Sequence, residues 1–141
     1  IRAGEIRDWK GLREAVRAEV ENRREIVVGS SVETVARVMT SLIAYIRMPD
    51  PRVPSEVRDA VNQWLDKNGF TTGFGVFKRV DWDKLHEYFK QLAENVSREY
   101  GVVGLELLSK TTAVFQEMLK QEIGVEVNLQ QILAQVIVQS R

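Results

Sequence analysis

The hydrophobic positions of this chain recur at i, i+3, i+4 and i+7 along almost its whole length. That spacing is typical of helices with one buried face. The pattern predicts an initial helix that ends before Gly29 and further helices over 32–47, 54–68, 81–100, 103–123 and from 129 onward. The predicted fold class is therefore all-α.

Local signals set the ends of these helices. Asp81 and Asn128 are placed as N-caps, and residues 30–33 have the spacing of a capping box. Gly101 and Gly124 follow the last periodic residue of their helices, where a left-handed residue commonly ends a helix. The boundaries are thus predicted independently of the hydrophobic pattern.

One segment breaks the helical pattern. Residues 69–77 interleave three glycines with Phe70, Phe74 and Phe77 and predict a loop or a short hairpin. The glycine spacing is not that of a phosphate-binding loop. We expect the phenylalanines to pack against the rest of the chain or against a neighbouring subunit.

The three prolines of the chain all lie in 49–54, which cannot continue a helix. They divide the chain into an N-terminal two-helix arm (1–48), a Pro-rich hinge (49–54) and a compact four-helix bundle (55–141). We expect the arm to project from the bundle. The predicted core of the bundle is Val57, Val61, Trp64, Leu85, Phe89, Leu92, Val96, Leu107, Leu108, Phe115, Leu119, Leu133 and Val136.

Charge is balanced overall but sorted locally. Twenty basic and twenty acidic residues give a net charge of zero, yet eight of the thirteen arginines lie in 1–47. On a helix, one face of the arm becomes a basic stripe beside an apolar stripe that includes Trp9. The stripe contains Arg2, Lys10, Arg13, Arg17 and Arg24.

Two readings of this stripe stay open. Guanidinium groups suit phosphate because their planar fork donates two parallel hydrogen bonds. The 32–47 helix adds a small, hydroxylated and basic face that includes Arg37 and Arg47. Both faces could instead be ordinary solvated surfaces, since the arm also contains i,i+4 pairs of opposite charge such as Arg17 and Glu21.

The sequence contains no motif that indicates catalysis. It has no cysteine, and His86 is its only histidine, which we expect to be a partly exposed structural residue. No nucleophile, phosphate-loop or metalloprotease motif is present, so we expect no enzyme activity, no cofactor and no metal site. No apolar run approaches the ~18 residues that would cross a bilayer.

The layout of a basic helical arm, a proline segment and an apolar bundle resembles the major coat proteins of rod-shaped and filamentous archaeal viruses. The stretch from Tyr88 to Tyr100 and Gly101, followed at once by an apolar helix, is similar to the Tyr-rich helix, Tyr-Gly break and apolar helix of such proteins. The resemblance implies a structural protein of the virion, present in the host cytoplasm during assembly. Such proteins polymerise into a helical nucleocapsid.

The resemblance also implies partners and contact residues. The partners would be double-stranded DNA, held in the A form, and other copies of the chain or a paralogous coat protein, with no small-molecule substrate. The DNA-phosphate set would be Arg2, Lys10, Arg13, Arg17, Arg24, Arg37 and Arg47. The subunit contacts would be Trp9, Phe70, Phe74 and Phe77.

Two alternatives belong to other classes of protein. In one, the 54–68 and 81–100 helices form a helix-turn-helix-like unit of an archaeal or phage regulator, although 69–80 is long for the turn of that motif. In the other, the chain is a protein–protein adaptor whose arm binds a partner.

Overall fold

The structure is a computed structural model that describes residues 32–48 and 52–139, with side chains described as far as residue 135. This part of the chain is mostly helical, as predicted. Its elements are α3 (Val32–Arg47), α4 (Ser55–Lys67), β1 (Thr71–Thr72), the short 3-10 helix η2 (Gly75–Phe77), β2 (Arg79–Val80), α5 (Trp82–Tyr100), α6 (Gly104–Ile123) and α7 (Leu129–Gln139).

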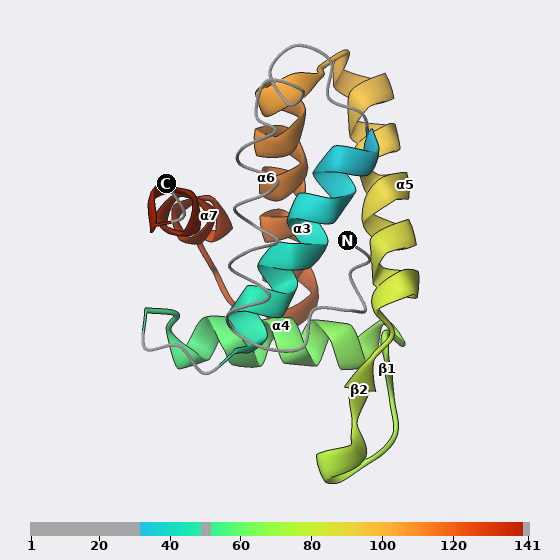
Figure 1. The fold of residues 1–141 in the computed structure, drawn as a ribbon, viewed down its shortest axis with the longest axis vertical. Helices are drawn as coiled ribbons and strands as arrows, with labels where there is room; N and C mark the ends of the chain where they lie inside the picture. The colour runs from blue at the N-terminus through green and yellow to red at the C-terminus, as the bar shows by residue number, and fades with distance from the viewer. Residues whose placement is uncertain (1–31, 49–51, 140–141) are drawn as a thin grey trace.

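Three helices follow the long axis of the molecule, and a fourth crosses them. In Figure 1, α3, α5 and α6 run roughly vertically, and α4 lies across their lower end. α7 lies to one side, seen nearly end-on, and packs on α6. The antiparallel hairpin of β1 and β2 extends downward from the junction of α4 and α5, at the opposite end from the α5–α6 connection.

The predicted caps at Asp81, Asn128, Gly101 and Gly124 are confirmed, and the other described helix ends lie within one residue of the prediction. The side chain of Asp81 accepts a hydrogen bond from the amide of Lys84 at 3.1 Å, and that of Asn128 accepts one from the amide three residues later at 3.0 Å. Gly101 and Gly124 end α5 and α6 in the left-handed region, with φ of 64° and 82°. The predicted capping box at 30–33 begins outside the described residues.

The predicted core is also largely confirmed. Leu92 is only half-buried, and the side chain of Val136 lies outside the description. Every other predicted core residue is buried. Trp64, Phe89 and Phe115 are fully buried, and the rings of Phe89 and Phe115 meet edge to face at 5.2 Å. The spacing in α4, α5 and α6 therefore predicted which faces meet.

The prediction that the N-terminal arm projects from the bundle is wrong for residues 32–47. α3 does not project but packs against α5, α4 and α6, and its apolar side chains belong to the same core as theirs. Arg58 of α4 fixes the end of α3 by donating to the carbonyls of Ile46 at 3.1 Å and Met48 at 3.0 Å. In the predicted hinge, Val53 is buried in the core. The body therefore includes α3, and the predicted four-helix bundle is incomplete without it.

The small, hydroxylated face of α3 is not the exposed face that the sequence suggested. Thr34, Thr40, Ser41 and Ala44 are all buried. Hydroxyl groups can be buried at little cost when they find a partner, and Thr40 donates to the carbonyl of Ala36 one turn earlier at 2.8 Å. Small side chains also allow other segments to pack closely against a helix.

Candidate functional site

The hairpin between α4 and α5 is rooted in the core by Phe70. Its ring is buried and stacks on Trp64 with centroids 5.2 Å apart, while Tyr88 meets it edge to face at 5.3 Å. The backbone continues the anchorage, because the amide of Asp81 donates to the carbonyl of Phe70 at 2.7 Å. Phe70 is therefore a core residue of its own chain, and its prediction as a subunit contact is wrong.

A carboxylate on α4 contacts β1 and the residue that precedes β2. Asp66 accepts a hydrogen bond from the hydroxyl of Thr71 in β1 at 2.8 Å, and its other oxygen pairs with Nζ of Lys78 at 3.0 Å. The hydrogen bond from Thr71 and then that from Lys78 hold the pKa of Asp66 below its usual range. On the other side, Nζ of Lys84 donates to the carbonyl of Gly69 at 2.8 Å.

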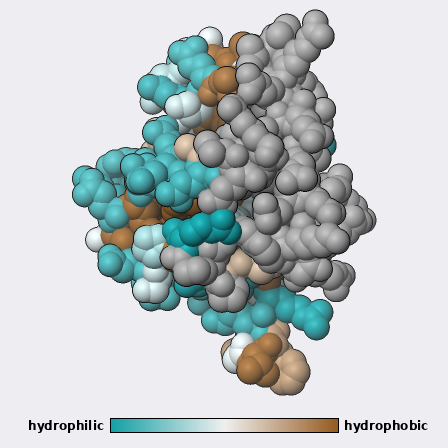
Figure 2. Space-filling view, turned by 60° about the vertical axis from the view of Figure 1, so that its left-hand side comes forward, coloured by the Kyte–Doolittle hydropathy of each residue, from teal (hydrophilic) through white to brown (hydrophobic). Residues whose placement is uncertain are grey.

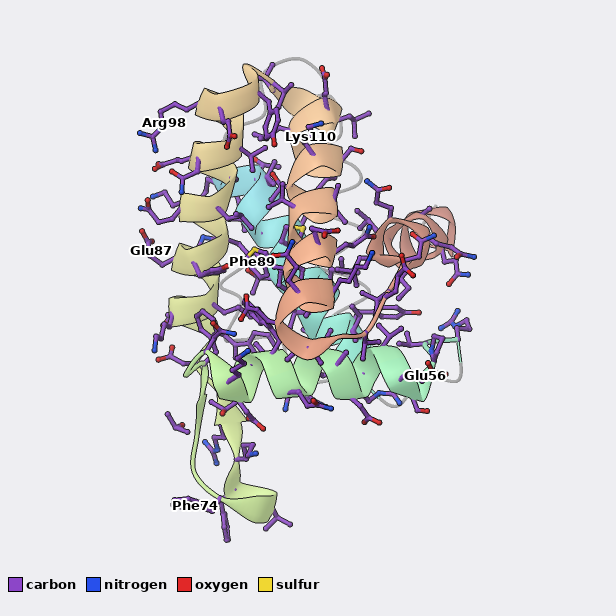
Figure 3. The ribbon with its side chains drawn as sticks, turned by 180° about the vertical axis from the view of Figure 1, so that it is seen from behind. Glu56, Phe74, Glu87, Phe89, Arg98 and Lys110 are labelled. Atoms are coloured by element: carbon purple, nitrogen blue, oxygen red, sulfur yellow. The ribbon has the colours of Figure 1, made fainter. Side chains whose placement is uncertain are left out.

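The tip of this rooted hairpin is strongly apolar and exposed. Phe74, Val76 and Phe77 are 90%, 92% and 77% exposed. Figure 2 shows the tip as a brown projection below a mainly teal surface, and Figure 3 places Phe74 at its far end. We call these three side chains the hairpin tip. A compact apolar group held away from the core of a folded chain is typical of a protein contact site.

The conformation of the tip is fixed by glycine. Gly73 has φ of 86°, and a Cβ atom there would lie 2.5 Å from the carbonyl oxygen of Phe77. The turn closes through hydrogen bonds from the amide of Phe77 to the carbonyl of Phe74 at 3.0 Å and from Lys78 to Gly75 at 3.2 Å. The exposed side chains are therefore presented by an ordered turn.

The hairpin carries only positive charge. No acidic residue occurs in 67–80, where Lys67, Lys78 and Arg79 are the charged residues. Lys78 is paired with Asp66, and Lys67 donates to the carbonyl of Glu122 at 3.1 Å. Arg79 is exposed and has no partner within the described part of the chain. One unpaired cation therefore lies two residues from the hairpin tip.

A second exposed apolar patch lies where α5 turns into α6. Tyr100, Val103 and Leu105 are 47%, 59% and 52% exposed. We call these three side chains the corner patch. Tyr100 and Gly101 end α5, and the α5–α6 connection lies at the upper end of the molecule, away from the hairpin (Figure 1).

The acids and cations beside the corner patch differ in their pairing. Glu99 and Glu106 are exposed and have no partner among the residues described. The neighbouring cations are engaged, since Arg98 donates to Oδ1 of Asn95 at 2.7 Å and Nζ of Lys110 lies 4.6 Å from the ring centroid of Tyr100. Glu99 and Glu106 are therefore carboxylates without a cation partner among the described residues, while Arg98 and Lys110 keep their charge beside Asn95 and Tyr100.

The structure does not bring the predicted phosphate-binding residues together. Arg2, Lys10, Arg13, Arg17 and Arg24 lie outside the described residues, as does Trp9 of the predicted subunit contacts. Arg37 and Arg47 are both half-buried, and at 1.5 Å per residue they are about 15 Å apart along α3. They do not form one exposed basic surface.

Arg47 in particular is built into the body. Its Nε donates to Oδ1 of Asn62 at 3.0 Å, and its guanidinium lies 6.0 Å from the ring centroid of Trp82. Burial lowers the pKa of Arg47, and the charge of Asp66 partly offsets this. Arg47 is therefore engaged by Asn62 and Trp82 of its own chain. The structure gives no support to the prediction that Arg47 contacts phosphate.

His86 links two helices of the body. Its Nε2 lies 2.8 Å from Oε1 of Glu33, and Nζ of Lys90 lies 3.9 Å from the other oxygen of that carboxylate. The first turn of α3 is thereby tied to α5. The histidine is only partly exposed, as predicted.

Within the described ranges, no group of three or more His, Asp or Glu side chains is arranged to hold a metal ion. No helix in the same ranges is long and apolar enough to cross a membrane. Comparison of the chain with known protein families, with curated proteins and with solved structures found no match.

Sequence reasoning found part of this candidate site. It singled out Phe74 and Phe77 as contact residues but missed Val76, which is as exposed as they are. It also missed the corner patch, because Val103 and Leu105 continue an apolar run into a helix that contributes buried residues such as Leu107 and Leu108 to the core. The absence of acids from 67–80 was the available signal that the hairpin differs from the rest of the surface.

Proposed function

We propose that this protein is a structural subunit that polymerises into a helical nucleocapsid and wraps double-stranded DNA through phosphate contacts. The observation that carries the assembly part is the hairpin tip. Exposing two phenylalanines and a valine to water is unfavourable, at about 25 cal/mol per Å² of apolar surface. A rooted and ordered turn that nevertheless presents them favours a contact with another protein surface.

The DNA part of the proposal rests on the basic stripe of residues 1–31. The described body gives it little support, because residues 32–48 and 52–139 carry twelve basic and thirteen acidic side chains. With Arg37 and Arg47 half-buried, the phosphate contacts are assigned to Arg2, Lys10, Arg13, Arg17 and Arg24. A protein that coats a whole genome would bind through backbone phosphates without base readout.

The helix-turn-helix alternative is disfavoured by the connection between α4 and α5. That motif needs a turn of three or four residues, whereas the hairpin here occupies the whole interval from Phe70 to Val80. The adaptor alternative differs from the proposal in one observable property, which is assembly without nucleic acid.

Electron microscopy of the full chain, with and without double-stranded DNA, tests the proposal directly. We expect filaments that contain DNA and that form on DNA of any sequence. Filaments that form equally well without nucleic acid would favour the adaptor, and a chain that stays monomeric at all concentrations with DNA would refute the proposal.

Salt dependence of DNA binding tests the assigned arginines. We expect Arg13→Ala and Arg17→Ala each to lower the slope of log affinity against log salt by about one, equally for unrelated DNA sequences. Lys120→Ala is the matched control, because Lys120 is an exposed cation on α6 beside Glu126. An unchanged slope in both arginine variants would remove the phosphate contacts and leave an assembly protein without DNA.

A further inference from the structure

The two exposed apolar patches found among the described residues lie at opposite ends of the long axis of the molecule. The hairpin tip is at one end, and the α5–α6 connection with its corner patch is at the other (Figure 1). Figure 3 shows the same separation from behind, with Phe74 at the lower extreme and Arg98 and Lys110 near the upper end. The patches are therefore too far apart to meet within one copy.

The charges beside the two patches are complementary. Arg79 next to the hairpin tip has no partner in the described part of the chain, and neither do Glu99 and Glu106 next to the corner patch. The hairpin tip thus offers a cation beside exposed apolar side chains, and the corner patch offers two carboxylates beside exposed apolar side chains. Complementary charges of this kind fix orientation and exclude the wrong pairing.

We infer that the hairpin tip of one copy docks on the corner patch of the next copy, with Arg79 directed toward Glu99 and Glu106. The inference rests on the proposed assembly function and names the surfaces that make its contact. Because the two surfaces differ, the contact is heterologous, and repetition produces an open chain of subunits in place of a closed dimer.

The size of the hairpin tip agrees with a contact that is repeated many times. An aromatic side chain buries about 150–250 Å², so the two phenylalanines offer on the order of 300 Å². A standard interface takes about 800 Å² from each partner. One such contact is too small to hold two copies together alone, and it suits a polymer in which each subunit has other contacts as well.

Other occupants fit the hairpin tip less well. A nucleic-acid groove would call for several free cations, whereas Arg79 is the one hairpin cation without a hydrogen-bond or ion-pair partner among the described residues. A membrane surface attracts clusters of four to eight Lys or Arg and favours Trp or Tyr at the interface, and the segment 69–80 has neither feature. A second copy of the chain fits better, because its corner patch offers both apolar side chains and carboxylates to the hairpin tip and Arg79.

The absence of cysteine allows a direct test by disulfide cross-linking. Val76→Cys and Val103→Cys each place one thiol in one of the two patches, at exposed positions where folding should be unaffected. Under mild oxidation of the assembled full chain, the double variant should give a ladder of covalent multimers. Each single variant alone should stay mainly monomeric, and an equal mixture of the two should give dimers.

Two controls make the cross-linking result decisive. Gln91→Cys replaces Val103→Cys in the double variant, because Gln91 is exposed in the middle of α5, and we expect no ladder from that pair. Covalent dimers of Val76→Cys alone would show tip-to-tip contact and overturn the inference. Cross-linking of that thiol to DNA through a thiol-reactive photoprobe would overturn it as well, by making the hairpin tip a nucleic-acid contact.

Charge reversal provides a second measurement that does not depend on thiol geometry. Arg79→Glu and Glu106→Arg should each lower the assembled fraction in sedimentation about tenfold, and the double variant should recover most of it. Glu87→Arg on the flank of α5 is the control and should assemble normally (Figure 3). Filaments that are indifferent to all these changes would overturn this contact and leave the proposed function intact, whereas a monomer under every condition would overturn the proposed function itself.

Discussion

Trp64 shows how single residues organise this core. Its ring contacts Phe70 of the hairpin, Tyr88 and Phe89 of α5 and Phe115 of α6, with centroids between 4.8 and 6.4 Å apart. Aromatic pairs at these distances contribute beyond the area that they bury. One residue of α4 therefore connects α5, α6 and the hairpin.

The same substitution at two positions should separate core from contact surface. Phe115→Ala removes a fully buried ring and should lower the free energy of unfolding by about 3–5 kcal/mol. Phe77→Ala removes an exposed ring and should change it by less than about 0.5 kcal/mol. Urea unfolding followed by circular dichroism measures both, and equal effects would mean that the faces are misassigned.

At the scale of elements, one exposed carboxylate, that of Asp66, adds to the contacts that hold the hairpin on α4. The hydrogen bonds from Thr71 and Lys78 lower the pKa of Asp66 in the folded state, so they favour the ionised form. A lowered folded pKa stabilises the protein above the unfolded value of about 3.9 and loses that effect as the pH falls through the folded pKa. The hold of α4 on the hairpin should therefore weaken only in acid.

Amide exchange of the hairpin measures this pH dependence. We expect protection of the β1 and β2 amides to fall below about pH 4, relative to the amides of α6. Asp66→Asn should lose this dependence and show the weakened hairpin already at neutral pH. The expectation fails if the wild-type hairpin keeps the same relative protection down to pH 2.

The helices were predictable because their signals are local. Asp81 and Gly101 bound α5 through contacts with residues of the same helix end, so the sequence contains all the information. The hairpin differs. Phe70, Phe74 and Phe77 have the same side chain, and only the position of Trp64 makes the first of them a core residue. That difference is tertiary, and no spacing within 69–77 encodes it.

At the scale of the whole molecule, α3 belongs to the same packed body as α4, α5 and α6, although the proline segment predicted a separate arm. Prolines at 49, 51 and 54 predict the end of a helix, and they do not predict where the following chain packs. Val53 enters the core and Arg58 holds the carbonyl end of α3, so the two sides of the proline segment are packed together. An amphipathic pattern alone could not say which neighbour would cover α3.

A core substitution in α3 should therefore destabilise the entire body. Ile43 is fully buried, and Ile43→Ala in the full chain should lower the free energy of unfolding by about 2–5 kcal/mol in one transition that includes α5 and α6. Val103→Ala, at an exposed position, is the control and should have little effect. If α3 melted separately, while the near-ultraviolet circular dichroism of α5 and α6 stayed unchanged, the result would support the original prediction that α3 belongs to an independent arm.

The rooting of the hairpin also decides where a pulling force would travel. A load applied at Phe74 would pass along the paired strands into the ring of Phe70, and from there into the rings around Trp64. A row of subunits joined through this element would therefore be stiff, and stretching it would strain the interior of each subunit before the connection lengthened.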